Sequence, residues 1–135
     1  MSINKVIICS DGAARGNPGP AAIGATVKDD KGNPLAVISR RIGITTNNQA
    51  EYQAIIAALE KAISLSAKYV ELKTDSELVV KQINGRYKVK KATLRTHYQK
   101  VIQLTGSLES FTISYIPREQ NREADELANK ALDST

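Results

Sequence analysis

Four acidic residues in this sequence stand where predicted strands end or predicted helices begin. They are Asp11 after the first strand, Glu51 in the first turn of the first helix, Asp75 after the fourth strand and Asp125 in the first turn of the last helix. In mixed α/β sheets, ligands collect beyond the carboxyl ends of the strands, where the strand order reverses. Carboxylates gathered there repel one another, so they must take up protons or bind a cation. Oxygen ligands favour Mg²⁺ or Mn²⁺ over zinc.

Two such ions would suit the hydrolysis of a phosphodiester. At about 4 Å apart, one ion activates the attacking water and the other stabilises the leaving 3′ oxygen. Each acid also has an ordinary structural explanation. Asp11 before Gly12 would be a turn residue, Glu51 a capping-box residue, Asp75 an N-cap, and Asp125 an acid that complements a helix dipole. Position alone therefore indicates a site without proving one.

The pattern of apolar and turn-forming residues predicts the elements that would position these acids. We expect strands at 6–9, 22–28, 35–44, 69–74 and 111–116, and helices from 45 or 46 through at least 63, from 75 to 83, from 93 to 108, and from 121 or 122 to 132. The glycines and prolines between Asp11 and Pro20 predict a turn. The order βββαβααβα predicts an α/β fold with helices flanking one mixed sheet, its fourth strand parallel to the first.

Length and composition limit the class of protein. A chain of 135 residues fits one domain, 1–135, and 41% hydrophobic with 24% charged residues is typical of a globular protein. The lone cysteine, Cys9, excludes an intramolecular disulfide and lies in a predicted buried strand, where we expect inert packing. No apolar run approaches the ~20 residues of a membrane span, and the first apolar stretch is too short for a signal peptide. We expect a cytoplasmic monomer without membrane contact.

Basic residues are concentrated in one part of the chain. The net charge is +5, from 19 Lys and Arg against 14 Asp and Glu. Seven of the 19 lie between Lys81 and Lys100, with no acid among them. Such a stretch is either the solvated face of a helix or a surface that contacts the phosphates of a nucleic acid. Charge alone does not decide between the two.

The local sequences around the four acids are far more specific than their positions. The acids lie in four segments, Ser10 to Pro20 (SDGAARGNPGP), Thr46 to Glu51 (TNNQAE), Thr74 to Ser76 (TDS) and Asn121 to Ala128 (NREADELA). In this order and spacing they resemble the motifs of ribonuclease H type 1, and the resemblance covers nearly the whole chain. It implies a five-stranded sheet in the order 3-2-1-4-5. It also implies an endonuclease that hydrolyses the RNA strand of RNA/DNA hybrids, leaving 5′-phosphate and 3′-hydroxyl ends.

The resemblance further implies roles for individual residues. The catalytic residues and metal ligands would be Asp11, Glu51, Asp75 and Asp125, holding two Mg²⁺ or Mn²⁺ ions. Asn17 and Thr46 would lie at a pocket for a phosphate of the DNA strand. Asn47 would reach bases in the minor groove, and Asn48 would do the same or hold the loop. The backbone of Gly12, Ala13 and Ala14 would face RNA 2′-hydroxyls, which distinguish RNA from DNA.

Two departures from the best-known pattern of this family concern side chains near the site. A histidine often precedes the last aspartate, whereas residues 115–122 contain none, and Arg118 or Glu119 would substitute by contacting phosphate or metal-bound water. The only histidine, His97, lies in the predicted third helix, where we expect a surface or packing role. Glu77 stands where a glutamine often contacts the minor groove. An acid there would face phosphate unfavourably unless it turned toward metal or solvent.

A third departure is the absence of a basic protrusion with tryptophans. Residues 84–91 (NGRYKVKK) form only a short basic connection, and the chain has no Trp. In this respect the sequence resembles the short archaeal-type branch of the family, which also occurs in bacteria. Affinity for the hybrid would then be weaker and sensitive to salt, with Lys88, Lys90 and Lys91 as its main contacts. Tyr87 would either stack on a sugar or base or pack in the core of an interrupted helix.

Two alternatives to a hybrid-specific nuclease remain at this stage. The chain could be a nucleic-acid-binding module of the same fold with weak catalysis, although a binder gains nothing from concentrating negative charge against phosphates. It could also be a nuclease with broadened activity, because the archaeal-type branch also suggests RNA/RNA duplexes as substrates. A comparison of hybrid, duplex RNA and duplex DNA as substrates would separate these possibilities.

Overall fold

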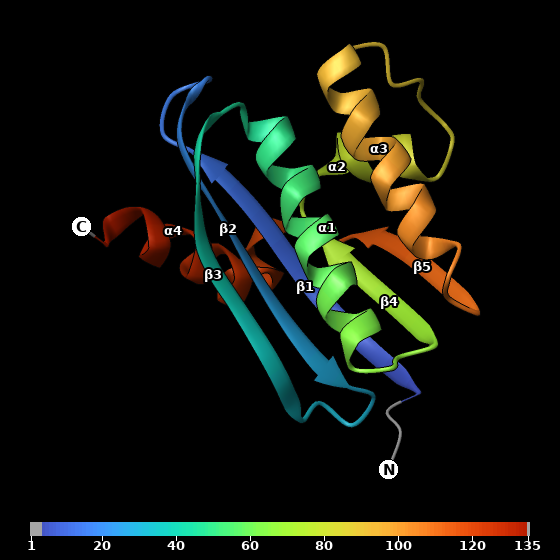
Figure 1. The fold of residues 1–135 in the computed structure, drawn as a ribbon. Coiled ribbons are helices and arrows are strands. Elements are labelled where there is room, and N and C mark those ends of the chain that lie inside the picture. The colour runs from blue at the N-terminus through green and yellow to red at the C-terminus, as the bar shows by residue number, and fades with distance from the viewer. Residues whose placement is uncertain (1–3, 135) are drawn as a thin grey trace.

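The computed structural model describes residues 4–134; residue 135 and residues 1–3, the first part of the segment assessed as a signal peptide, lie outside it. Within residues 4–134 the chain forms one sheet and four α-helices (Figure 1). In chain order the elements are β1 (Lys5–Ala14), β2 (Gly19–Asp29), β3 (Pro34–Thr45), α1 (Asn47–Ser64), β4 (Tyr69–Thr74), α2 (Glu77–Ile83), α3 (Ala92–Thr105), β5 (Ser110–Tyr115), the 3₁₀ helix η1 (Arg118–Gln120) and α4 (Arg122–Asp133).

The strand order in the sheet is β3-β2-β1-β4-β5, which confirms the expected topology. The first three strands form an antiparallel meander, while β4 pairs parallel to β1 and β5 parallel to β4. The order of the strands therefore reverses between β1 and β4. Asp11 and Asp75 directly follow the last parallel pair, Ser10 with Thr74, and so lie at the place where α/β sheets usually bind ligands.

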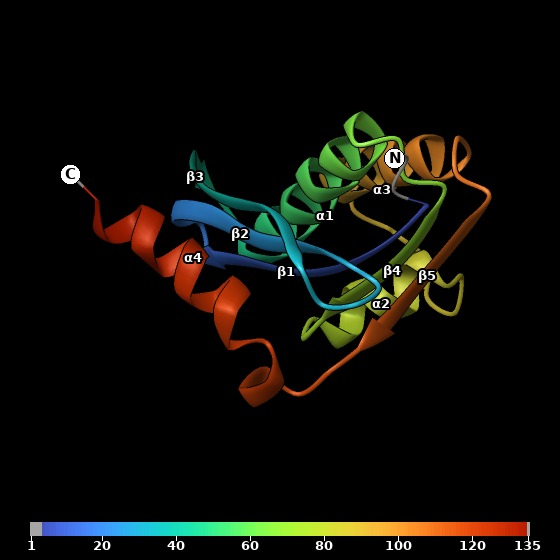
Figure 2. The ribbon, with the colours of Figure 1, turned by 90° about the horizontal axis from the view of Figure 1, so that it is seen from below.

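Helices cover both faces of the sheet. Figure 2 shows α1 and α3 on one face, with α2 and α4 on the other. The main core lies between the sheet and α1, and its largest fully buried side chains include Ile8, Tyr52, Ile55 and Leu59. A smaller apolar cluster forms where α4 packs on β2, around Leu132. No helix within residues 4–134 is long and apolar enough to cross a membrane.

The predicted turn from Asp11 to Pro20 is wrong in its extent. Residues 11–14 continue β1, residues 19 and 20 already belong to β2, and only residues 15–18 form the turn. The strand continues because Gly12, Ala13 and Ala14 pair in register with β2. Their side chains are small or absent, so they leave room for helices on both faces of the sheet. Asp11 therefore lies within β1 instead of at its end.

Two glycines allow helices to touch the sheet backbone. A Cβ atom at Gly12 would lie 2.2 Å from the carbonyl carbon of Ala50 in α1. A Cβ atom at Gly24 would lie 2.2 Å from the carbonyl oxygen of Ala124 in α4. Real Cβ atoms do not approach backbone so closely, so these positions require glycine for the packing of α1 and α4. The start of each helix is thereby held against the strands that carry the site.

The helix boundaries differ from the prediction by a few residues. Thr46 is the N-cap of α1, and its side chain accepts a hydrogen bond from the backbone N–H of Gln49 at 3.2 Å. The second helix begins one residue after its cap at Ser76, so the proposed N-cap role of Asp75 is wrong. The third helix ends at Thr105, before Gly106, instead of at residue 108. The 3₁₀ helix before α4 was not predicted.

Candidate active site

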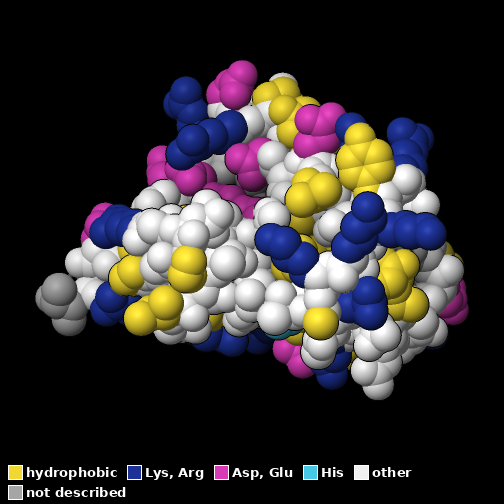
Figure 3. Space-filling model, turned by 90° about the horizontal axis from the view of Figure 1, so that it is seen from above, with side chains coloured by type: hydrophobic (Ala, Val, Ile, Leu, Met, Phe, Trp, Pro, Cys, Tyr) yellow, Lys and Arg dark blue, Asp and Glu magenta, His cyan; other side chains and the backbone are white. Residues whose placement is uncertain are grey.

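A cleft of about 430 Å³ opens at the end of the sheet where β1 and β4 diverge. Figure 3 shows acidic side chains gathered in this hollow, with Lys and Arg side chains on both sides of it. Of the residues singled out in the sequence, the cleft is lined by Asp11, Gly12, Ala13, Ala14, Asn47, Asn48, Glu51, Asp75, Arg118 and Asp125. Four residues that were not predicted complete the lining, namely Arg15, Ser76, Asn129 and Leu132.

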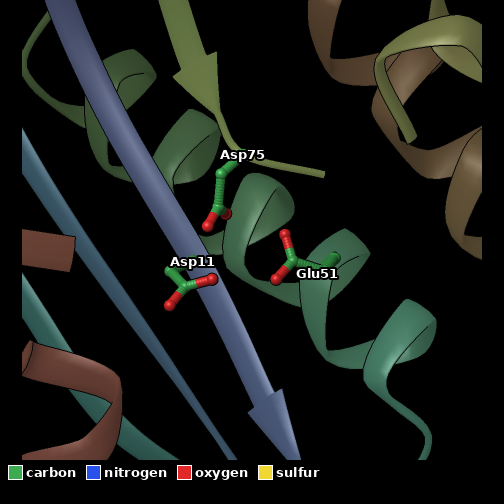
Figure 4. A group of neighbouring side chains, drawn as sticks. All are labelled: Asp11, Glu51 and Asp75. Atoms are coloured by element: carbon green, nitrogen blue, oxygen red, sulfur yellow. The ribbon is translucent and has the colours of Figure 1, made fainter. Parts of the chain in front are cut away.

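Three of the four predicted acids form a tight group. Asp11 comes from β1, Glu51 from α1 and Asp75 from the residue that follows β4. Figure 4 shows their carboxylates pointing toward one another, and one oxygen from each lies within 4.8 Å of the others. Segments separated by many residues thus deliver three hard oxygen donors to one point, which is the arrangement that a divalent cation requires.

Glu51 is fixed by hydrogen bonds from two strands. Its Oε1 accepts from the backbone N–H of Gly12 at 2.9 Å, and its Oε2 accepts from the hydroxyl of Thr74 at 3.2 Å. It is the fifth residue of α1, so the expectation that it lies in the first turn is wrong by one position. Both oxygens are hydrogen-bonded and the side chain is buried, so these contacts hold the carboxylate in the cleft.

The electrostatics of this group favour a bound cation. Burial raises the pKa of Asp11 far above that of an ordinary aspartate, and the neighbouring Glu51 and Asp75 raise it further. Burial also raises the pKa of Glu51, although its hydrogen bonds act in the opposite direction. The cluster cannot be fully ionised at neutral pH without a compensating positive charge. An all-oxygen donor set that needs positive charge fits a hard divalent metal ion.

Asp125 joins the same cleft from the first turn of α4, but it is not part of the tight group. Asn129, one turn later, donates a hydrogen bond to its Oδ1 at 3.2 Å. Nη2 of Arg118 lies 3.8 Å from the same oxygen. Asp125 is also one of the groups that raise the pKa of Asp11. The structure therefore brings all four predicted acids to one cleft, three of them tightly and the fourth at its side.

Asn121 begins the fourth motif, and the sequence alone assigned it no role in the site. It is 1% exposed, and its Nδ2 donates to the carbonyl of Ser10 at 2.9 Å and to Oδ1 of Asp75 at 3.4 Å. Its own Oδ1 has no hydrogen-bond partner among the described residues. One amide thus connects β1, the acid after β4 and the start of α4. Its place in the fourth motif, four residues before Asp125, was the available signal.

Asn17 and Asn47 hydrogen-bond the turn after β1 to the start of α1 beside the cleft. Oδ1 of Asn17 accepts from the backbone N–H of Asn47 at 3.0 Å, and Oδ1 of Asn47 accepts from the backbone N–H of Ala14 at 2.9 Å. Thr46 stands next to Asn47 as the N-cap of α1. The turn after β1 and the start of α1 are therefore hydrogen-bonded to each other, and Asn17 and Thr46 lie on these two segments.

The predicted basic contacts lie farther from the acids. Lys88, Lys90 and Lys91 are exposed on the connection between α2 and α3 and are not among the described residues that line the cleft. Tyr87 is 50% exposed, with the Lys81 ammonium 5.1 Å from its ring, so the alternative of core packing is wrong. Glu77 turns away from the cleft to an ion pair with Lys81 at 3.1 Å.

The only histidine and the only cysteine of the chain are packing residues. His97 stacks on Tyr52 with ring centroids 6.4 Å apart, and partial burial lowers its pKa. Cys9 is partly buried in β1, and burial raises the pKa of its thiol. A raised pKa leaves little thiolate at neutral pH, so the thiol is a poor nucleophile. Neither side chain lines the cleft that holds the acids.

The family of this chain follows from comparison with known proteins. The reverse transcriptase-like family matches residues 9–131. The crystal structure of RNase H1 from the halophilic archaeon Halobacterium salinarum superposes with a TM-score of 0.95 at 42% identity, covering 98% of this chain and all of that one. The chain belongs to the ribonuclease H type 1 family. The sheet order and the acidic cleft described above are thus those of a ribonuclease H domain.

Two further ribonuclease H structures are similarly close. The N-terminal RNase H domain of Rv2228c from Mycobacterium tuberculosis has a TM-score of 0.93 at 42% identity, covering 96% of this chain and 99% of that one. LC11-RNase H1 in complex with an RNA/DNA hybrid has a TM-score of 0.90 at 47% identity, covering 95% and 96%. The chain spans only 62% of the length of the Halobacterium ribonuclease HI and 36% of the whole Rv2228c protein.

Proposed function

We propose that this ribonuclease H chain is an endonuclease that hydrolyses the RNA strand of RNA/DNA hybrids and leaves 5′-phosphate and 3′-hydroxyl ends. The observation that carries the proposal is the group of carboxylates from Asp11, Glu51 and Asp75, with oxygens within 4.8 Å of one another. Its family membership and the hybrid bound by the similar LC11-RNase H1 support the choice of substrate.

The residues that would hold metal are the four acids of the cleft. Asp11, Glu51, Asp75 and Asp125 would bind two Mg²⁺ or Mn²⁺ ions, which supply Lewis-acid activation of water and stabilisation of the leaving oxygen. The protein's own contribution is to keep the donors in place. Gly12 and Thr74 orient Glu51 through both of its oxygens. Burial of Asp11 and Glu51 limits access of bulk water and strengthens each charge interaction at the phosphodiester.

Recognition of a hybrid would use the two segments that lock together beside the cleft. The carbonyl oxygen of each amide side chain is occupied, in Asn17 by the N–H of Asn47 and in Asn47 by the N–H of Ala14. Each amide still has its NH₂ group as a donor, which would suit a DNA phosphate at Asn17 with Thr46, and base edges at Asn47. The adjacent backbone, which lines the cleft from Gly12 to Ala14, would contact RNA 2′-hydroxyls, and Asn48 would assist.

Basic residues around the cleft would provide affinity and assist the chemistry. Arg118 lines the cleft and lies 3.8 Å from Asp125, and it would contact the phosphodiester. Glu119 follows it in the same exposed 3₁₀ helix and is the candidate to accept a proton from water. Lys88, Lys90 and Lys91 would contact phosphates beyond the cleft. These three lysines are exposed and would contribute to binding only through their charge, so their contribution would be sensitive to salt.

We also propose that residues 1–135 act as one catalytic domain and as a monomer. All four acids come from one chain and line one cleft, so a second copy is not needed to complete the site. RNA/DNA hybrids arise as replication primers and transcription loops, which favours the cytoplasm as the compartment.

The experiment that tests the function compares three labelled substrates of one sequence, an RNA/DNA hybrid, duplex RNA and duplex DNA, in Mg²⁺ and in Mn²⁺. Wild type should cut only the RNA strand of the hybrid, and the Asp75→Asn variant should leave it intact. Binding of the hybrid without cleavage in either metal would indicate a binding module instead. Cleavage of duplex RNA at a similar rate would indicate the broadened activity.

A further inference from the structure

An ion pair joins the turn after β1 to the far end of α4. Nη2 of Arg15 lies 2.5 Å from Oδ1 of Asp133, although the two residues are 118 positions apart. Arg15 lines the acidic cleft, and α4 contributes Asn129 and Leu132 to the same lining. Asp133 is the last residue of that helix and directly follows Leu132. The pair therefore lies at the edge of the cleft, and neither partner had a role in the proposed chemistry.

The pair is poorly suited to a purely structural role. The side chain of Arg15 is 50% exposed and that of Asp133 is 65% exposed, and exposed ion pairs contribute little to folding stability. A carboxylate at the C-terminal end of a helix also faces the negative end of the helix dipole, which is unfavourable. The end of α4 is also held by another contact, since Nη1 of Arg41 donates to the carbonyl of Ser134 at 3.1 Å.

The backbone of Arg15 is held independently of its side chain. Its N–H donates to the carbonyl of Pro20 at 2.8 Å, and the preceding residue, Ala14, donates to Asn47. The guanidinium therefore extends from a fixed point beside the segment proposed to face the RNA. Since breaking the exposed pair with Asp133 requires little energy, the guanidinium is available to another anion that enters the cleft.

We infer that Arg15 binds a backbone phosphate of the nucleic acid in the cleft and that Asp133 competes with this phosphate for the guanidinium. The inference rests on the proposed function, since it needs a nucleic-acid substrate. An arginine offers paired N–H donors that suit phosphate as well as carboxylate, so a phosphate can replace Asp133, whose exposed carboxylate is then solvated by water. Asp133 thus lowers the affinity for substrate, and Arg15 raises it.

The test measures binding of a fluorescent RNA/DNA hybrid to the full chain carrying Asp75→Asn, which prevents cleavage. In this background, Arg15→Gln should weaken binding about tenfold and reduce the slope of log Kd against log salt by about 0.9, the value for one phosphate contact. Asp133→Asn should tighten binding about two- to fivefold, because it removes an exposed competing pair. Asp133→Asn should have no such effect once Arg15→Gln is present.

A second exposed ion pair supplies matched controls. Lys68 and Glu109 lie 3.9 Å apart with exposures of 59% and 55%, and they precede β4 and β5, at the end of the sheet opposite the cleft. Lys68→Gln and Glu109→Gln change the net charge by the same amounts as the variants at Arg15 and Asp133. Neither control should change the affinity by as much as twofold.

The outcomes separate the possible failures. Opposite effects of Arg15→Gln and Asp133→Asn, larger than those of the controls, support the inference. Weaker binding in both variants would show that the ion pair acts only by holding α4, and effects equal to the controls would show that only net charge matters; either result overturns it. If the unsubstituted chain and the Asp75→Asn background both fail to bind hybrid, the proposed function itself is wrong and the inference falls with it.

Discussion

Gly12 donates its backbone N–H to Oε1 of Glu51 at 2.9 Å, across 39 positions of sequence. The same glycine leaves the space that α1 occupies, since a Cβ atom there would lie 2.2 Å from the carbonyl carbon of Ala50. One residue thus sets both the distance between β1 and α1 and the orientation of a carboxylate in the cleft. The geometry of the site depends on how closely a helix approaches a strand, in addition to the identity of the acids.

The first prediction concerns this close approach. Gly12→Ala should move the start of α1 away from β1, lower the free energy of unfolding by about 1–3 kcal/mol and reduce hybrid cleavage more than tenfold. Urea denaturation and initial rates in Mg²⁺ measure the two effects. Gly106→Ala is the control, because Gly106 has a helical φ of −63° and no contact under 3.3 Å to a new Cβ. Equal behaviour of both variants would contradict the argument.

The second prediction concerns pH and the metal-free stability. Burial raises the pKa of Asp11 and Glu51 in the folded state, whereas the unfolded chain has ordinary values near 4. The folded protein therefore holds more protons than the unfolded chain above pH 4. Its stability falls as pH rises from about 4 toward the raised pKa values, at about 1.4 kcal/mol per unit of pKa difference. Below pH 4 both states are protonated and the effect disappears.

Asp11→Asn removes most of this pH-dependent penalty. In EDTA at pH 8 the variant should be more stable than wild type, and the difference should shrink as the pH approaches 4. Adding Mg²⁺ at pH 8 should stabilise wild type more than the variant. Thermal unfolding at several pH values measures both effects. A variant that is less stable than wild type at pH 8 would show that the carboxylates are not repelling one another.

The third prediction concerns Asn121. Asn121→Ala should reduce the free energy of unfolding by about 1–3 kcal/mol, because it leaves the buried carbonyl of Ser10 without its donor. It should also lower kcat and raise the metal concentration needed for activity, since Asp75 loses a hydrogen bond. Asn84→Ala removes an amide that donates to the carbonyl of Ile113 outside the cleft. The control should lose stability alone, and an equal loss of kcat in both variants would rule out positioning by Asn121.

The fourth prediction concerns the basic connection between α2 and α3. Replacing Lys88, Lys90 and Lys91 together with Gln should weaken hybrid binding and reduce the slope of log Kd against log salt by up to about 2.7. The matched control replaces Lys31, Lys61 and Lys68, which are also exposed. Binding titrations at several salt concentrations measure the slopes. Indistinguishable slopes in the two triple variants would show that these lysines are only solvated and do not contact the phosphates of the hybrid.

Much of this molecule was predictable from short-range patterns. The strand at Tyr69–Thr74 was located correctly at both ends, because an alternating pattern is bounded by clear turn residues. The sheet order and the shared cleft of the acids followed from the motifs. The length of β1 did not, since Gly12 is read as a turn residue unless one knows that a helix packs against it. Small residues mark close packing and turns alike, and tertiary contacts decide between them.

The parts of the site that could not be predicted depend on distant contacts. Nothing in the local sequence of Arg15 indicates a partner 118 positions away at Asp133. Asn121 sits in a motif, but its hydrogen bond to the carbonyl of Ser10 depends on how α4 docks against β1. Asn129 could have been predicted from the sequence, because a residue four positions after Asp125 on a helix lies on the same face.

The most direct measurement of the central claim is Mn²⁺ binding by electron paramagnetic resonance, with wild type compared with Asp75→Asn. Asp30→Asn is the control, as Asp30 is exposed in the connection between β2 and β3. If the acids of the cleft hold the cation, Asp75→Asn should weaken Mn²⁺ binding about tenfold or more, and Asp30→Asn should leave it unchanged. Equal Mn²⁺ affinity in wild type and Asp75→Asn would contradict the assignment of this cleft as the metal-dependent active site.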